Sequence, residues 1–172
     1  LTTFLLTVIF DLTIAIEIGL LLALVLFMKR MSEVTHITVA KDQLDLSNEG
    51  EIYHEEEKLI VPQGVEVYEI DGPFFFGVAN KFDECMKTIG DKPRIRIIRM
   101  RKVPFMDTTG LHNLESLYRL STKEKIQVIL SGVNEQVRAT LVKSSFARTI
   151  GEENICSNIH EALKRAEVCL KS

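Results

Sequence analysis

Residues 94–111, RIRIIRMRKVPFMDTTGL, join a predicted strand to a predicted helix. The isoleucine content of 94–103 is typical of a β-strand. Asp107 can cap the helix that follows, because its carboxylate can accept a backbone N–H that the first turn leaves without a partner. This stretch therefore predicts a strand that turns into a capped helix, with apolar positions continuing to Tyr118.

On both sides of this stretch, segments with a period of two alternate with segments at helical spacing. Such an order predicts an α/β domain with a parallel or mixed sheet. We expect four or five strands in a mixed sheet covered by about four helices, preceded by a transmembrane helix. The further elements are expected as strands at 58–61, 65–70, 73–78 and 126–133, and as helices over 78–89, from Asn134 and from Asn158.

The charge is distributed unevenly over the 172 residues, although the formal net charge is only -3. All 21 Lys and Arg follow residue 28, so the sequence joins an apolar piece to a charged one. The global charge argues against a strongly basic nucleic-acid binder, and we expect no nucleic-acid partner. The regular apolar patterning of the later segments excludes disorder throughout. Because the sequence begins with Leu1 and not Met, we expect it to be part of a longer protein.

The apolar piece predicts a membrane span over 12–28, since only Thr13 and Glu17 interrupt it. Basic residues follow the run at Lys29-Arg30, whereas a signal peptide carries them before it. The same pair favours a cytoplasmic C-terminal side. We interpret Glu17 as a helix-packing or interfacial carboxylate, with part of an ion pathway as the alternative.

The expected division is the end of a transmembrane domain over 1–28, a charged linker over 29–57 and a soluble domain over 58–172. Residues 42–57 hold seven acids and no base, which is typical of a solvated connector. Contact of this acidic run with a basic patch is the alternative, and the segment 92–102 supplies the bases for one.

The candidate site is the motif Asp107-Thr108-Thr109-Gly110. A hydroxyl in the first turn lies close to the positive end of the helix dipole, where a phosphate on it would be favoured. Asp107 would oppose that charge, and an ordinary capped helix is the plainer interpretation.

The basic strand 94–103 offers a second feature of interest. A solvated sheet end explains its arginines most simply, and an anionic partner is the alternative. Arg99 and Arg101, the arginines nearest the motif, are our candidates for an anion or partner contact.

The strand into Asp-Thr-Thr-Gly-Leu, the LSGV strand at 130–133 and the Asn-capped helix after it resemble the STAS domain, named after sulfate transporters and anti-sigma-factor antagonists. In the small antagonists, a partner kinase phosphorylates the second hydroxyl residue of the motif and so switches binding. That resemblance implies Thr109 as a phosphorylation site, with Thr108 beside it. Threonine keeps the hydroxyl of the usual serine but adds a methyl group.

Together with the apolar segment, the sequence is similar to the C-terminal end of SulP anion transporters. The resemblance implies a secondary anion transporter with a cytoplasmic STAS domain acting in regulation, assembly or partner binding. Its partners would be the rest of the transporter membrane domain, a second copy in a homodimer and a cytosolic regulatory protein, with an inorganic anion as substrate. The alternatives are a membrane-tethered phosphoswitch and, more remotely, a module that binds a nucleotide or acyl group.

Other chemistry is not supported by the sequence. The three cysteines form no C-x-x-C pair, and Cys85 and Cys169 occupy apolar helical positions. Cys156 and His160 could share a helical face, but a zinc site needs about four ligands and no second pair stands nearby. The histidines and glycines form no catalytic triad, P-loop or dinucleotide motif. We therefore expect no enzyme activity, no catalytic residue, no metal and no cofactor.

Overall fold

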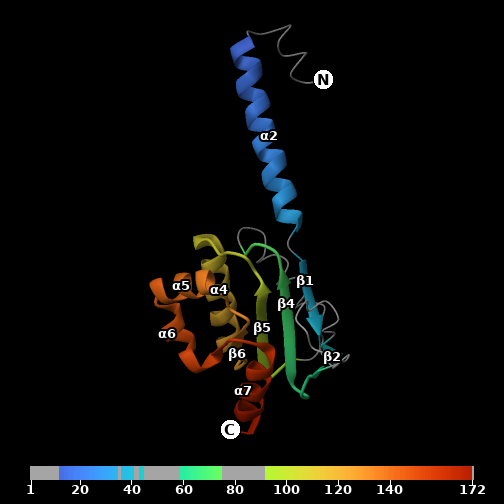
Figure 1. Cartoon of the computed structure of the whole chain (residues 1–172), viewed down its shortest axis with the longest axis vertical. Helices are drawn as coiled ribbons and strands as arrows, with labels where there is room; N and C mark the ends of the chain where they lie inside the picture. The colour runs from blue at the N-terminus through green and yellow to red at the C-terminus, as the bar shows by residue number, and fades with distance from the viewer. Residues whose placement is uncertain (1–11, 35, 41–42, 45–58, 75–91, 172) are drawn as a thin grey trace. The chain divides into compact units, whose positions relative to one another are not determined.

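The computed structural model describes residues 12–34, 36–40, 43–44, 59–74 and 92–171 (Figure 1). The chain divides into two compact units, Leu1–Val34 and Thr35–Ser172.

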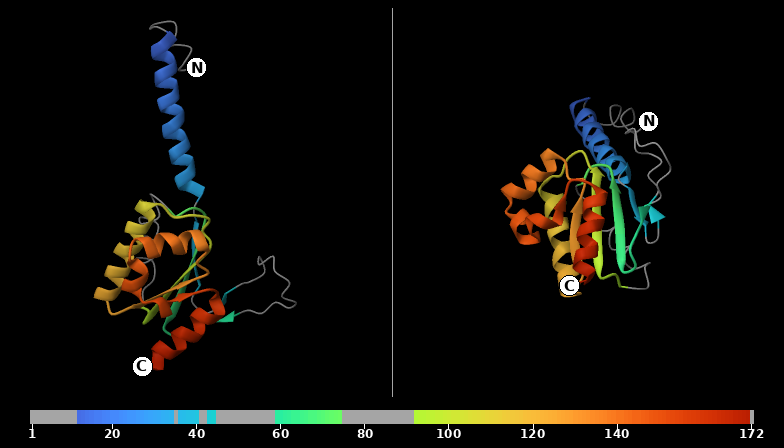
Figure 2. Two further views of the ribbon diagram at one scale, coloured as in Figure 1. Left: turned by 60° about the vertical axis from the view of Figure 1, so that its left-hand side comes forward. Right: turned by 60° about the horizontal axis from the view of Figure 1, so that its bottom comes forward.

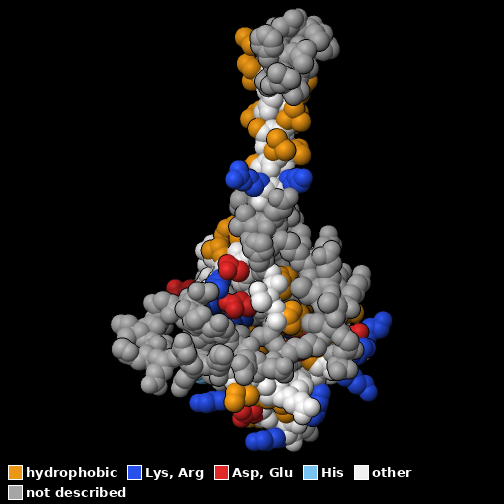
Figure 3. Space-filling view, turned by 90° about the vertical axis from the view of Figure 1, so that its right-hand side faces the viewer, with side chains coloured by type: hydrophobic (Ala, Val, Ile, Leu, Met, Phe, Trp, Pro, Cys, Tyr) orange, Lys and Arg blue, Asp and Glu red, His pale blue; other side chains and the backbone are white. Residues whose placement is uncertain are grey.

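The first unit contains helix α2, Leu12–Val34. Its stretch Leu12–Arg30 is long and apolar enough to cross a membrane. Most of its large apolar side chains are exposed, and Figure 3 shows them along the helix. The helix begins where the sequence predicts the span and continues six residues past its expected end at residue 28. Glu17 is exposed on this helix, and the residues before Leu12 lie outside the described part.

The second unit is built on a five-stranded sheet with the order β1-β4-β5-β6-β7. Strand β1 runs antiparallel to β4, whereas the other neighbours are parallel, so the sheet is mixed as predicted. A separate antiparallel pair consists of β2 and β3. The strands are β1 (His36–Ala40), β2 (Gln43–Leu44), β3 (Leu59–Ile60), β4 (Val65–Asp71), β5 (Ile95–Lys102), β6 (Gln127–Ser131) and β7 (Ile155–Cys156).

Strand β1 lies inside the segment expected to be a linker over 29–57. It pairs with β4 over five residues, from His36 opposite Asp71 to Ala40 opposite Val67. Only Thr35 separates it from the last residue of α2. The sequence HITVA does alternate polar and apolar residues, with Ile37 and Val39 packed against the core and Thr38 exposed. The run is only five residues long and was interpreted as part of the charged linker, so no strand was expected there. Most of the acidic run, 45–57, lies outside the described residues.

Helices cover both faces of the sheet (Figures 1 and 2). One core lies between the sheet and α4–α6 and includes Ile98, Met100 and Leu114. A second core lies beneath α7 and includes Ile95, Ile97 and Leu163. The helices are α4 (Thr108–Lys123), α5 (Glu135–Lys143), α6 (Phe146–Ile150) and α7 (Ile159–Lys171), with a 3₁₀ turn at Glu152–Asn154.

The predicted helix starts are confirmed by their capping bonds. Asn134 Oδ1 accepts the N–H of Val137 at 2.9 Å, and Asn158 Oδ1 accepts that of Glu161 at 2.9 Å. The short helix α6 was not predicted, because Ser145 turns the chain at a positive φ of 64° immediately before it. The strand expected at 73–78 is described only to Phe74, and the helix expected over 78–89 lies outside the described residues.

Candidate functional site

The motif begins the helix α4 at the carboxyl end of β5. Asp107 is its N-cap, and Asp107 Oδ1 accepts the backbone N–H of Gly110 at 2.7 Å. The Asp107 carbonyl then accepts the N–H of Leu111 at 3.0 Å, which starts the helical ladder. The predicted cap is therefore confirmed, and the Asp107 side chain is engaged by its own helix.

Both motif hydroxyl residues, Thr108 and Thr109, are exposed. They form the first two positions of α4, where backbone N–H groups and the helix dipole favour negative charge. The geometry thus leaves their hydroxyl groups accessible to a modifying enzyme or to a partner surface.

Gly110 permits a close approach of two backbones. A Cβ at this position would lie 1.9 Å from the carbonyl oxygen of Phe74. The segment 72–74 pairs with the motif loop. The Phe74 N–H donates to Phe105 O at 3.1 Å, and Phe74 forms an isolated parallel β-bridge with Met106. The glycine of the motif is therefore explained by packing of the 72–74 segment on the first helical turn.

Asn134 holds the motif loop from the other side. Its Nδ2 donates to the carbonyl of Val103 at 2.7 Å and to that of Pro104 at 3.3 Å, while its Oδ1 caps α5. The sequence predicted Asn134 as a helix cap but gave no sign of its hydrogen bonds to the motif loop. Between Phe74 and Asn134 the backbone of 103–107 is fixed, and Pro104 and Phe105 are exposed on it.

The structure separates Arg99 from this motif. By strand alternation, Arg99 faces the same side as Ile95 and Ile97, whereas α4 packs on the other side. Arg99 is only 4% exposed, so the expectation of a solvated sheet end does not hold for it. Arg101 is exposed beyond it.

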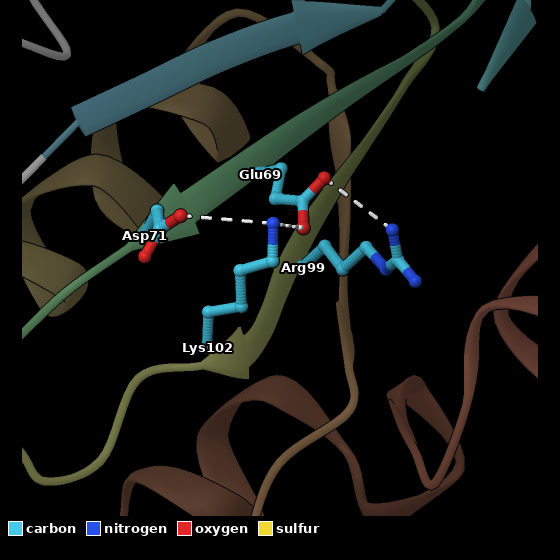
Figure 4. A network of polar contacts seen from close by, with 4 residues as sticks. All are labelled: Glu69, Asp71, Arg99 and Lys102. Carbon is cyan, nitrogen blue, oxygen red and sulfur yellow. Dashed lines mark hydrogen bonds and ion pairs between the residues drawn. The ribbon is translucent and has the colours of Figure 1, made fainter. Parts of the chain in front are cut away.

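Arg99 belongs to an ion-pair network at the end of β4 and β5 (Figure 4). Arg99 Nη1 lies 3.3 Å from Glu69 Oε2, and Lys102 Nζ lies 3.3 Å from Glu69 Oε1 and 3.6 Å from Asp71 Oδ2. Burial, and then the charge of Arg101, lower the pKa of Arg99. The pairing register shifts here, so Lys102 comes opposite Asp71.

A second buried polar network was missed from the sequence. Arg96 Nη1 donates to Ser121 Oγ at 2.7 Å, and its guanidinium lies 5.2 Å from the ring centroid of Tyr68. Tyr68 Oη donates to Glu66 Oε2 at 2.9 Å. Burial raises the pKa of Tyr68, the hydrogen bond to Glu66 raises it further, and the charge of Arg96 opposes the shift. The signal that the sequence offered was Arg96, a charged residue inside the apolar run Ile95–Ile98.

Cys156 and His160 lie on different elements of the structure. Cys156 ends β7, whereas His160 belongs to α7, so the idea of one shared helical face is wrong. Burial raises the pKa of the Cys156 thiol, as does the nearby Glu161 carboxylate. Within the described ranges no group of three or more metal-ligating side chains occurs. Cys85 lies outside those ranges.

Comparison with known families fits this geometry. The STAS domain profile matches residues 58–162, and the chain belongs to the STAS domain family. Within that class it is homologous to SulP sulfate and bicarbonate transporters. Sulfate transporter 1.1 of Arabidopsis thaliana is 32% identical over 165 residues, covering 87% of this chain and 25% of the relative. Bicarbonate transporter BicA of Picosynechococcus sp. is 29% identical over 168 residues, covering 94% of this chain and 29% of the relative. The chain therefore spans about a quarter of the length of these relatives.

Solved structures support the same assignment. The STAS domain of a SulP transporter from Vibrio cholerae is 37% identical with a TM-score of 0.58, covering 64% of this chain and 86% of that one. An anti-sigma factor antagonist from Mycobacterium paratuberculosis shares the fold at 18% identity and a TM-score of 0.52, covering 77% of this chain and 95% of that one.

Proposed function

We propose that this chain is the C-terminal part of a secondary anion transporter. In this proposal α2 is its last membrane span, the STAS unit is cytoplasmic, and the transported substrate is an inorganic anion. The homology to sulfate and bicarbonate transporters supports the proposal, as does the apolar stretch Leu12–Arg30. The role of the STAS unit is regulation or assembly through contacts with the rest of the transporter, a second copy or a cytosolic protein.

The observation that carries the regulatory role is the motif surface, which consists of Pro104, Phe105, Thr108 and Thr109. Its side chains are exposed, yet its backbone is fixed by Phe74 on one side and Asn134 on the other. A partner that binds such a surface loses little conformational entropy from the loop, because the loop backbone is already held by these hydrogen bonds.

The test uses the full-length transporter in proteoliposomes and cells. Thr109→Arg places a bulky cation on the motif surface, and Lys164→Ala on the exposed face of α7 is the matched control. We expect the first variant to lower sulfate or bicarbonate uptake per transporter, or its abundance in the membrane, and the second to match the parent. Parental behaviour of Thr109→Arg would remove the regulatory role from this surface. Absence of uptake of either anion by the parent would count against the transporter proposal for these substrates.

A second candidate is a phosphoswitch at Thr109, with Thr108 beside it. The exposed hydroxyls at the start of α4 favour it, since a phosphate there would meet backbone N–H groups and the helix dipole. Incubation with candidate kinases and mass mapping tests it, with Thr109→Ser as the variant that removes only the methyl group. Absence of phosphate on both threonines and on that serine, together with parental partner binding by Thr109→Glu, would argue against a switch.

A further inference from the structure

The outer surface of the α4–α6 layer is strongly basic. Residues 108–150, which run from the start of α4 to the end of α6, contain six Lys or Arg and three acids, although the whole chain has a net charge of -3. All six basic residues are exposed. We call them the basic helical surface: Arg119, Lys123, Lys125, Arg138, Lys143 and Arg148.

Within the part of the chain that the structure describes, no carboxylate forms an ion pair with these cations, and Arg119 makes only a 3.5 Å contact with Ser116 Oγ. One of the three acids, Glu124, is already paired with Lys92 at 3.3 Å. The layer therefore presents net positive charge to whatever lies against it.

The arginines of strand β5 differ from these exposed cations in their burial. That strand has the densest basic sequence, but Arg96 and Arg99 are buried and bonded inside the domain. The anionic partner considered for Arg99 from the sequence is thus better matched by the helices. Val142 on α5, 58% exposed, adds an apolar side chain among the cations.

We propose that the basic helical surface binds the anionic headgroups of the membrane leaflet at which α2 ends. The proposal rests on the proposed membrane placement of α2. Lys29 and Arg30 at the end of the apolar stretch favour the cytoplasmic side, where anionic lipids are enriched. Since Thr35 alone separates α2 from β1, the covalent connection keeps the domain near that leaflet, and a bilayer is favoured over a diffusing acidic protein.

The experiment uses the full chain in nanodiscs of phosphatidylcholine, with or without phosphatidylserine. A fluorescent non-natural amino acid replaces Ala139, which is exposed on α5, and spin-labelled headgroups quench it on close approach. We expect stronger quenching with phosphatidylserine, and weaker quenching at high salt because the interaction is screened. Each base contributes about a fivefold factor to the bound population near such a surface.

Charge reversal identifies the surface responsible. The triple variant Arg138→Glu, Lys143→Glu, Arg148→Glu should lose the extra quenching, and an unchanged circular dichroism spectrum confirms that it folds. The matched control Lys164→Glu, Lys171→Glu changes exposed bases of α7 and should keep it. If the triple variant fails to fold, the neutral Arg138→Gln, Lys143→Gln, Arg148→Gln set replaces it, with the same expected loss.

Two results would overturn the proposal. Equal quenching in both nanodiscs, or quenching that the charge variants leave unchanged, would exclude headgroup binding and leave an acidic protein as the partner of this surface. Failure of the chain to enter nanodiscs would overturn the membrane placement as well, so the two proposals fail in distinguishable ways.

Discussion

Strand β5 and the segment that follows it differ in how far their polar side chains are buried. The strand turns Arg96 and Arg99 into the domain, where Ser121 and Glu69 hold them. A few residues later the first turn of α4 exposes Thr108 and Thr109. Polar residues that are already bonded contribute to the fold, whereas exposed ones on a fixed backbone are available to a partner. The charged strand therefore has a structural role, and the proposed recognition role falls to the loop and the first turn of α4.

The largest effect is expected from Gly110→Ala, which tests whether the loop backbone is as fixed as its contacts indicate. The new Cβ would come within 1.9 Å of Phe74 O and 2.8 Å of Phe74 C, and neither backbone atom can move away cheaply. We expect a loss of about 3 kcal/mol or more in the free energy of unfolding, at the upper end of overpacking effects. Urea denaturation of residues 35–172 measures it. A loss below about 1 kcal/mol would show that the 72–74 segment yields easily.

Arg99→Met tests the structural role of the charged strand. It leaves Glu69, whose side chain is 18% exposed, with Lys102 at 3.3 Å as its remaining recorded ion-pair partner. Breaking a buried pair typically costs about 3–5 kcal/mol, and Lys102 should reduce this to about 2–3 kcal/mol. Lys102→Met is the matched control and should cost under about 1 kcal/mol, since Lys102 is half-exposed.

The double variant Glu69→Met, Arg99→Met removes both charges of the pair. It distinguishes the loss of the ion pair from the cost of leaving Glu69 without Arg99. It should be more stable than Arg99→Met alone, because no charge is left buried. A double variant that is less stable than the single would show that Glu69 stabilises the fold without Arg99.

The fold was largely predictable because its strands and caps have local signals. The strand 94–103 and the helix starts at Asp107, Asn134 and Asn158 follow from composition and capping chemistry, and the structure confirms them. Strand β1 and helix α6 were missed for different reasons. The alternation in HITVA spans only five residues beside a charged segment, whereas α6 depends on a left-handed turn at Ser145 that local periodicity does not encode.

The site was predictable only in part. Asp107, Thr108, Thr109 and Gly110 lie where the motif indicates, at the start of α4. Arg99 was expected to lie near the motif because the two are close in sequence. Successive side chains of a strand point to opposite faces of the sheet, and Arg99 points away from α4. Phe74 and Asn134 contact the motif loop although they lie about thirty positions from it in the sequence. No local pattern predicts such contacts.

A smaller, pH-dependent effect is expected at Tyr68, which lies beside the charged strand beneath Arg96. Burial raises the pKa of Tyr68 above its ordinary value of 10.0, so above that pH the unfolded chain ionises while the folded one does not. The stability present below pH 10.0 should then fall with pH by up to about 1.4 kcal/mol per unit. Tyr68→Phe removes this component, at a cost near neutral pH of about 1 kcal/mol for the lost hydrogen bond.

Unfolding free energies of both proteins, measured from about pH 8 to about pH 11, test this expectation. The comparison between parent and variant cancels the titration of the lysines. Parallel pH profiles would show that the Tyr68 phenol ionises as easily in the fold as in the unfolded chain.

The smallest effect on stability is expected from Thr109→Ala. This variant tests most directly whether the motif surface and the charged strand differ in role. The side chain is exposed, so the free energy of unfolding should change by less than about 0.5 kcal/mol. If the loop is a recognition surface, the same variant should still alter transport or partner binding in the full-length protein. Unfolding and anion uptake measured on one set of variants then separate the two roles, because Arg99→Met should lower stability first and Thr109→Ala should change function without it. A loss of about 2 kcal/mol for Thr109→Ala would instead mean that this hydroxyl is bonded within the fold, and the division between strand and loop would have to be withdrawn.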